Sequence, residues 1–116
     1  MAYITTLLDE AVEKERMERE TQRLRLLEKL CDALDRGHKE IDFDDAYIFG
    51  SVTKPFRFSE ISDIDVGFVG LDDRDFFKMM SYLSAETGVD VDIVQLEDHR
   101  LADKVKREGI RWIKKD

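Results

Sequence analysis

Hydrophobic residues recur at helical spacing in two stretches of residues 3–36, a segment that contains neither glycine nor proline. The first stretch comprises Ile4, Leu7, Leu8, Ala11 and Val12, and the second comprises Leu24, Leu27, Leu30, Cys31 and Leu34. Residues 13–23 between them are nearly all polar, and Gly37 can end a helix as a C-cap. The pattern predicts one long helix, or two helices with a soft middle.

A helix of this length would span about 45–50 Å, which is more than a small domain can cover. We therefore expect its first half to project, to pack on a partner or to pair with a second copy of the chain. The alternative is that this half covers the same core as the rest of the chain. The pattern divides the sequence into a helical extension, residues 1–40, and a main domain, residues 41–116.

Short apolar runs alternate with amphipathic segments through the main domain. Strands are predicted at residues 46–50, 63–69 and 89–96, helices at 71–88 and 97–109, and a short last strand at 110–113. The stripe expected to be buried in the first of these helices comprises Phe76, Phe77, Met80 and Leu83. This order predicts an α/β (α+β) fold, in which helices pack on a small mixed sheet of three or four strands.

Composition narrows the class of protein. The 116 residues suit one domain, and a net charge of -8 argues against direct nucleic-acid binding, which needs a basic surface. A single cysteine, Cys31, excludes an internal disulfide and a cysteine-based zinc cluster. Neither a basic leader nor an apolar run of about 20 residues is present, so we expect a cytoplasmic protein that is not in a membrane.

Aspartates interrupt two of the predicted strands in the pattern Asp-x-Asp. Strand side chains alternate, so Asp63 and Asp65 share one face, with Cα atoms about 6.5–7 Å apart, and hydrophobic residues occupy the other face. Asp90 and Asp92 repeat the pattern. Neighbouring carboxylates are costly unless something neutralises them, and hard divalent cations that act in phosphoryl transfer prefer such ligands. The alternative is that these aspartates face water at strand ends.

Gly50-Ser51, directly after the first predicted strand, supplies complementary chemistry. Glycine lets the backbone approach a phosphate closely, and an amide and a hydroxyl at the start of a helical turn favour an anion. Lys54 and Arg57 in the same loop could contact a phosphate tail. The alternatives are a plain turn and ordinary surface charges.

Taken together, the segments FGS, SDIDVGF and VDIV resemble the minimal nucleotidyltransferases of the DNA polymerase β-like superfamily. Their pattern is a hydrophobic residue with Gly-Ser, a spacer, Asp-x-Asp, and a third Asp on a following strand. The resemblance covers residues 44 to about 113 and implies a nucleotidyltransferase (polymerase β palm-like) fold.

The resemblance also implies a role for each matching residue. Asp63 and Asp65 would ligate Mg²⁺, as one or two ions, and Asp92 would complete the metal site and help to deprotonate the acceptor hydroxyl. Asp92 is preferred to Asp90 because two apolar residues follow it, as in the family pattern. The residues implied in nucleotide binding are Gly50, Ser51, Lys54 and Ser62.

The implied activity is transfer of a nucleoside monophosphate, AMP from ATP, to a hydroxyl group. Minimal members of the family are often antitoxins paired with a helical HEPN-type toxin, and some transfer AMP to a tyrosine of that partner. We therefore expect a nucleoside triphosphate and a HEPN-like protein as partners, with a homodimer through the N-terminal helix as a further option.

The sequence departs from the family pattern in the phosphate loop. Lys54-Pro55 stand where many members have Arg-Gly, and proline offers no amide to a phosphate. The spacer of eleven residues, 52–62, is one longer than is frequent. The alternative function is therefore a non-catalytic binding module of the same fold, which neutralises a partner by occlusion.

Overall fold

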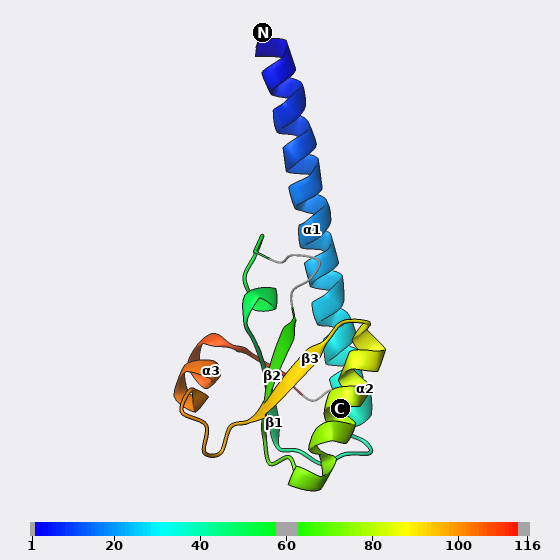
Figure 1. Ribbon diagram of the computed structural model, residues 1–116, viewed down its shortest axis with the longest axis vertical. Coiled ribbons are helices and arrows are strands. Elements are labelled where there is room, and N and C mark those ends of the chain that lie inside the picture. The colour runs from blue at the N-terminus through cyan, green and yellow to red at the C-terminus, as the bar shows by residue number, and fades with distance from the viewer. Residues whose placement is uncertain (1, 58–62, 114–116) are drawn as a thin grey trace.

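The computed structural model describes residues 2–57 and 63–113. Its helices are α1 (Ala2–Gly37), α2 (Phe76–Thr87) and α3 (Ala102–Glu108), and two short 3-10 turns are η1 (Ser51–Thr53) and η2 (Asp73–Asp75). Its strands are β1 (Asp45–Phe49), β2 (Ile64–Val69), β3 (Val91–Gln95) and β4 (Ile110–Arg111) (Figure 1). This order confirms the predicted alternation of elements, including the short last strand.

The four strands form one mixed sheet in the order β3-β2-β1-β4. Strand β1 is antiparallel to both β2 and β4, whereas β2 and β3 are parallel. Parallel neighbours need a crossover connection, and α2 lies in the connection between β2 and β3. The Gly-Ser loop follows the last residue of β1, at the end of the sheet where β2 and β3 begin. The Gly-Ser loop and the aspartates of β2 and β3 therefore lie at the same end of the sheet.

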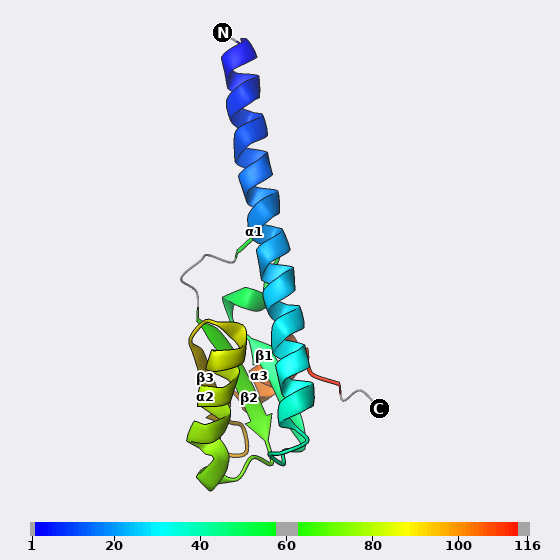
Figure 2. The ribbon, with the colours of Figure 1, turned by 90° about the vertical axis from the view of Figure 1, so that its right-hand side faces the viewer.

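Helices cover both faces of the sheet. Helices α1 and α2 pack on the face formed by Ile64, Val66 and Phe68, all fully buried, and Val105 of α3 packs with Tyr47 on the opposite face. Seen from the side, α1 and α2 lie in front of the sheet and α3 lies behind it (Figure 2). The predicted alternation of β2 is therefore correct.

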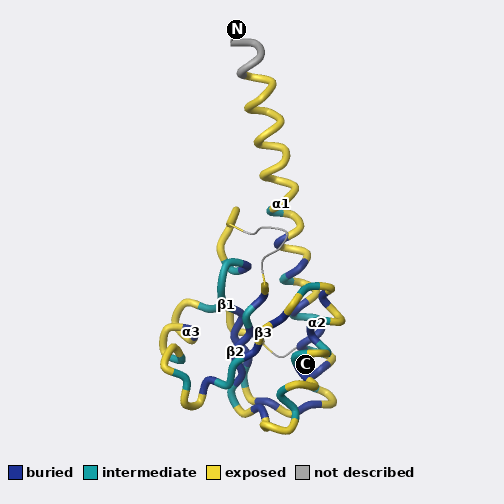
Figure 3. The backbone as a smooth tube through the Cα atoms, viewed as in Figure 1, coloured by how far each residue is buried: buried dark blue, intermediate teal, exposed yellow. Residues whose placement is uncertain are grey.

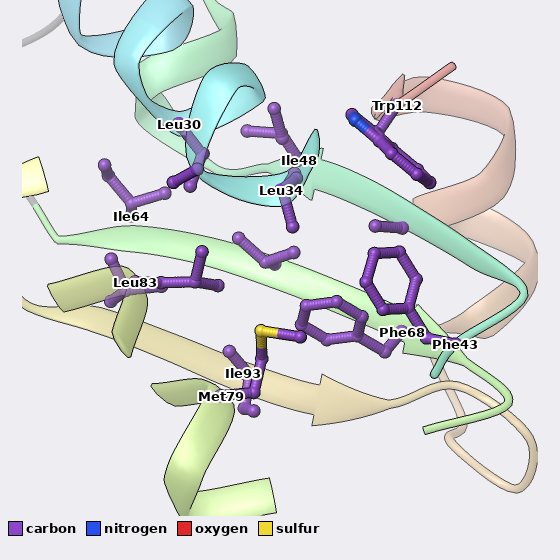
Figure 4. Packing of buried hydrophobic residues seen from close by; sticks show 14 of the residues in the cluster. Leu30, Leu34, Phe43, Ile48, Ile64, Phe68, Met79, Leu83, Ile93 and Trp112 are labelled. Atoms are coloured by element: carbon purple, nitrogen blue, oxygen red, sulfur yellow. The ribbon is translucent and has the colours of Figure 1, made fainter. Parts of the chain in front are cut away.

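The main core lies between the sheet and the two long helices. Residues of α1, α2 and the sheet meet there, among them Leu30, Leu34, Ile48, Ile64, Phe68, Met79 and Leu83 (Figure 4). Because the hydrophobic face of β2 is buried in this core, its aspartates are directed to the opposite face, on the side of α3.

The predicted buried stripe of α2 is wrong at one position. Phe77 is 74% exposed, while Met79, absent from the predicted stripe, is 0% exposed. The helix begins at Phe76 after η2, and its buried residues Met79, Leu83 and Thr87 are spaced four apart. Two residues correspond to about 200° of helical rotation, so Phe77 faces away from Met79 and from the core.

Helix α1 is a single helix of 36 residues, so a soft middle is absent. Its second half contributes Leu30 and Leu34 to the core, whereas residues 6–19 are exposed and extend beyond the sheet (Figure 3). This projection gives the molecule dimensions of 61 × 27 × 26 Å. Within the described residues, no helix combines the length and apolarity that crossing a membrane requires.

Candidate functional site

Two aspartates from adjacent strands lie side by side at the end of the sheet where these strands begin. In the parallel register of β2 and β3, Asp65 is paired with Asp92. Asp63 precedes β2 by one residue and lies two positions from Asp65. Asp90 lies before β3, where its carbonyl oxygen accepts a hydrogen bond from the Ile64 amide at 3.1 Å. The strand register therefore brings Asp92, and not Asp90, beside Asp65.

The charges of Asp92 and Asp63 act on the Asp65 carboxyl. Burial raises the pKa of the Asp65 carboxyl, and the negative charges of Asp92 and then Asp63 raise it further. Asp63 and Asp92 are exposed, while Asp65 is half-buried. Such a trio favours a cation, because a bound positive charge removes the repulsion that opposes ionisation.

The fit of the trio to a divalent metal rests on its donor chemistry. Three carboxylates on adjacent strands supply the oxygen ligands that Mg²⁺ prefers. However, in residues 2–57 and 63–113 no three His, Cys, Asp or Glu side chains are close enough together to hold a metal ion. The acids are therefore neighbours whose side chains would have to turn toward a bound ion.

The Gly-Ser loop closes the site on the β1 side. Phe49, the last residue of β1, is paired with Asp65 across β1 and β2, and Gly50 follows with a φ of +89°. A Cβ atom on Gly50 would lie 2.7 Å from Oδ2 of Asp65, so only glycine fits here without displacing the carboxylate. The loop backbone thus passes directly over the central acid of the trio.

Ser51 opens the expected helical turn, which is a 3-10 turn. The amide and the hydroxyl of Thr53 both donate to the Gly50 carbonyl oxygen, at 3.1 and 2.7 Å. The Lys54 amide donates to the carbonyl oxygen of Ser51 at 3.1 Å. These bonds fix a compact loop in which Ser51 directly follows the glycine that touches Asp65.

Lys54 lines a cavity of about 220 Å³ beside the loop. Its other lining residues are Phe49, Gly50, Thr53, Leu101, Lys104, Val105, Glu108 and Gly109. Lys104 is a second cation at this cavity that the sequence did not single out. The sequence could not have revealed it, because the position of α3 over β1 depends on tertiary packing. Arg57 is exposed in the same loop, and Ser62, also predicted to bind nucleotide, lies outside the described residues.

Comparisons with known proteins bear on the fold. Neither a family model nor a curated protein matches the sequence. A solved toxin–antitoxin with AMP-PNP is similar at 23% identity and a TM-score of 0.60, covering 77% of this chain and 73% of that chain. A mutant of the toxin–antitoxin MntA-HpeT with two Asp-to-Glu changes two positions apart has 21% identity and a TM-score of 0.58, with the same coverage.

The toxin–antitoxin MntA-HepT is a further solved structure with this fold. It is 20% identical, with a TM-score of 0.50, and the match covers 84% of this chain and 74% of that chain. Identities of 20% to 23% show similarity of fold. The fold that the resemblance implies is thereby confirmed: the chain shares its fold with solved toxin–antitoxin structures.

Proposed function

We propose that the protein is a metal-dependent nucleotidyltransferase that acts as the antitoxin of a toxin–antitoxin pair. It would transfer a nucleoside monophosphate, AMP from ATP, to a hydroxyl group and release pyrophosphate. The observation that carries the proposal is the pairing of Asp65 with Asp92 in register, with Gly50 held against the Asp65 carboxylate. Acids on neighbouring strands beneath a glycine loop suit a phosphate brought in with a metal ion.

Each residue has a role in the proposed reaction. Asp63, Asp65 and Asp92 would hold Mg²⁺, which when bound offsets negative charge on the phosphates. Asp92 would also accept the proton of the attacking hydroxyl group. Asp65, the most buried of the three, would lie at the centre of the site. The backbone at Gly50 and Ser51 would receive the phosphates.

Further nucleotide contacts would come from Lys54 and Ser62. Lys54 is exposed at the end of η1 and forms no ion pair with a described residue, so its ammonium group is available to a phosphate. Nucleotide binding is supported by the toxin–antitoxin of the same fold that was crystallised with AMP-PNP.

The partner proposed is a helical HEPN-type toxin that supplies a tyrosine hydroxyl as the acceptor. The three solved structures of similar fold described above are toxin–antitoxin structures. The first half of α1 also leaves Leu7, Leu8 and Val12 exposed by 49%, 62% and 64%, which offers apolar surface to a partner. A second copy of this chain is the competing occupant of that surface.

The direct test is transfer of radiolabel from α-labelled ATP to a candidate HEPN-type toxin, in the presence of Mg²⁺. Label should appear on a tyrosine of the toxin with the wild-type protein and should be lost with Asp63→Asn/Asp65→Asn. An Asp90→Asn variant is the matched control, since Asp90 lies outside the trio and should leave transfer intact. Transfer that persists without Asp63 and Asp65 would contradict the proposed mechanism.

A second candidate function is a binding module that neutralises the toxin by occlusion, without catalysis. Two observations favour it: Pro55 removes an amide from the phosphate loop, and the described acids are not closed around a metal position. Calorimetry separates the two candidates. Micromolar binding of Mg-ATP supports the enzyme, whereas tight toxin binding without nucleotide binding supports the module.

A further inference from the structure

A buried arginine links α1 to the loop that carries Ser51. Arg23 lies in the stretch of α1 whose residues are nearly all polar, yet only 5% of its surface is exposed. A buried guanidinium is costly unless its donors and its charge are matched. Arg23 is matched in two ways, by the Glu20 carboxylate one turn earlier and by a backbone carbonyl of the loop.

The contacts of this pair are specific. Arg23 Nε donates to Glu20 Oε2 at 3.0 Å, and Arg23 Nη2 donates to Glu20 Oε1. Arg23 Nη1 donates to the Val52 carbonyl oxygen at 2.9 Å. The Glu20 carboxylate accepts a further bond from the Phe56 amide, with 2.8 Å between N and Oε2. The pair thus bonds to the loop backbone at two points, four residues apart.

The two bonded backbone groups, at Val52 and Phe56, lie on either side of Lys54-Pro55. Val52 is the middle residue of η1, and its side chain is fully buried in the core. Phe56 has a φ of +62°, a conformation that a non-glycine residue keeps only where its surroundings enforce it. The Arg16 guanidinium lies over the Phe56 ring, 4.3 Å from its centroid. Helix α1 therefore holds the loop on both sides of Lys54-Pro55.

We propose that Glu20 and Arg23 are positioning residues that hold the loop of residues 50–57 in the conformation that presents Gly50 and Ser51 to a nucleotide. The inference rests on the proposed function for the identity of the ligand. It gives α1 a role in the site and not only in the core. Side chains of the helix bond to the loop backbone at Val52 and Phe56, on either side of Pro55.

Hydrogen exchange of the free protein tests, without nucleotide, whether Glu20 and Arg23 hold the loop. In Glu20→Ala the Phe56 amide loses its acceptor, so exchange in residues 52–57 should accelerate by about tenfold or more, while amides of β2 keep their protection. In Glu20→Gln the remaining oxygen can accept from Phe56, but the amide NH2 group faces the Arg23 donors, so protection should return only in part. Glu86→Ala, which removes the exposed Arg36–Glu86 pair, is the matched control and should leave the loop unchanged.

Three results would overturn the inference. One is unchanged loop exchange in a folded Glu20→Ala variant, and another is acceleration spread evenly over the sheet. The third is exchange in Glu20→Gln that is faster than in Glu20→Ala. Arg23→Lys offers a second check on the same amides, because lysine keeps the charge but cannot bond to the carboxylate and to Val52 with the geometry of a guanidinium. The Thr53 and Lys54 amides should exchange faster in that variant.

Calorimetry with Mg-ATP then measures whether the contacts of Glu20 with the loop affect nucleotide binding. If the wild type binds, Glu20→Ala should weaken Kd by about tenfold while Glu86→Ala stays within about twofold. Equal Kd values in wild type and Glu20→Ala would overturn the positioning role. If the wild type itself does not bind Mg-ATP, the proposed function fails, and the exchange data alone decide whether Glu20 and Arg23 hold the loop.

Discussion

Gly50 lies so close to Asp65 that a methyl group at Gly50 would come within 2.7 Å of the carboxylate oxygen Oδ2. The loop and the acid therefore share one space. Gly50→Ala should be destabilising by roughly 1–3 kcal/mol through its positive φ and should also displace Asp65, weakening Mg-ATP binding by at least about tenfold. Urea unfolding and calorimetry measure the two effects separately.

Gly88→Ala is the matched control for this prediction. Gly88 also has a positive φ, +76°, but an added Cβ there meets nothing within 4 Å. The control should therefore lose about 1–2 kcal/mol from backbone strain alone and keep its affinity for nucleotide. Equal loss of binding in both variants would mean that the Gly50–Asp65 contact has no special role.

Asp65→Asn should make the free protein more stable at neutral pH. Burial and the charges of Asp92 and Asp63 raise the pKa of Asp65 in the folded state, so folding favours its protonated form. That contribution is fully present below the unfolded pKa, near 3.8, and is lost as pH rises through the higher folded pKa. Asparagine cannot ionise, so the variant escapes the loss.

Thermal unfolding of both proteins from pH 3 to 8, without divalent ions, measures this effect. The gap in Tm in favour of Asp65→Asn should open as the pH rises and then level off. Asp90→Asn should show no comparable gain, because the charge of Asp90 does not contribute to the raised pKa. A variant less stable than the wild type at pH 7 would contradict the prediction.

Asp92 and Asp90 provide a paired test of metal binding. Since only Asp92 is in register with Asp65, Asp92→Asn should abolish the stabilisation that Mg²⁺ gives the wild type, while Asp90→Asn should retain it. At 100 times Kd a ligand that binds the folded state stabilises it by about 2.7 kcal/mol, a shift of several degrees in Tm. Absence of a Mg²⁺-dependent shift in the wild type would argue against a resident metal.

Local patterns in the sequence singled out the aspartates, whereas the resemblance to a family grouped Asp92 with Asp63 and Asp65. Alternation along β2 separates Asp63 and Asp65 from the hydrophobic face, because one side of a strand must meet the core. The register that pairs Asp65 with Asp92 depends on the crossover through α2, which no local pattern encodes. Glu20 was visible only as one charge in a polar stretch, since its partner Phe56 lies 36 residues away.

A similar limit explains the misplaced stripe of α2. Phe76, Phe77, Met80 and Leu83 have acceptable helical spacing, and so do Met79 and Leu83. Only the packing of α2 against α1 and the sheet decides whether Phe77 or Met79 is buried. Phenylalanine is the larger hydrophobe, so burial of Met79 in place of Phe77 was not the choice that composition favoured.

Helix α1 should respond differently to substitution in its two halves. Leu30 is 0% exposed in the core, so Leu30→Ala should cost about 2–5 kcal/mol of stability. Leu8 is 62% exposed on the projecting half, so Leu8→Ala should change stability by no more than about 0.5 kcal/mol. Urea unfolding at low protein concentration measures both.

The projecting half can still be occupied in solution, and concentration dependence reveals by what. If two copies pair through it, the Tm of the wild type should rise with protein concentration, and Leu8→Ala should abolish that rise. If a toxin occupies it, the Tm of the free chain should not depend on concentration, and Leu8→Ala should weaken only the complex. Because Leu8 lies far along α1 from the core, either result reports on the surface of the helix and not on the fold.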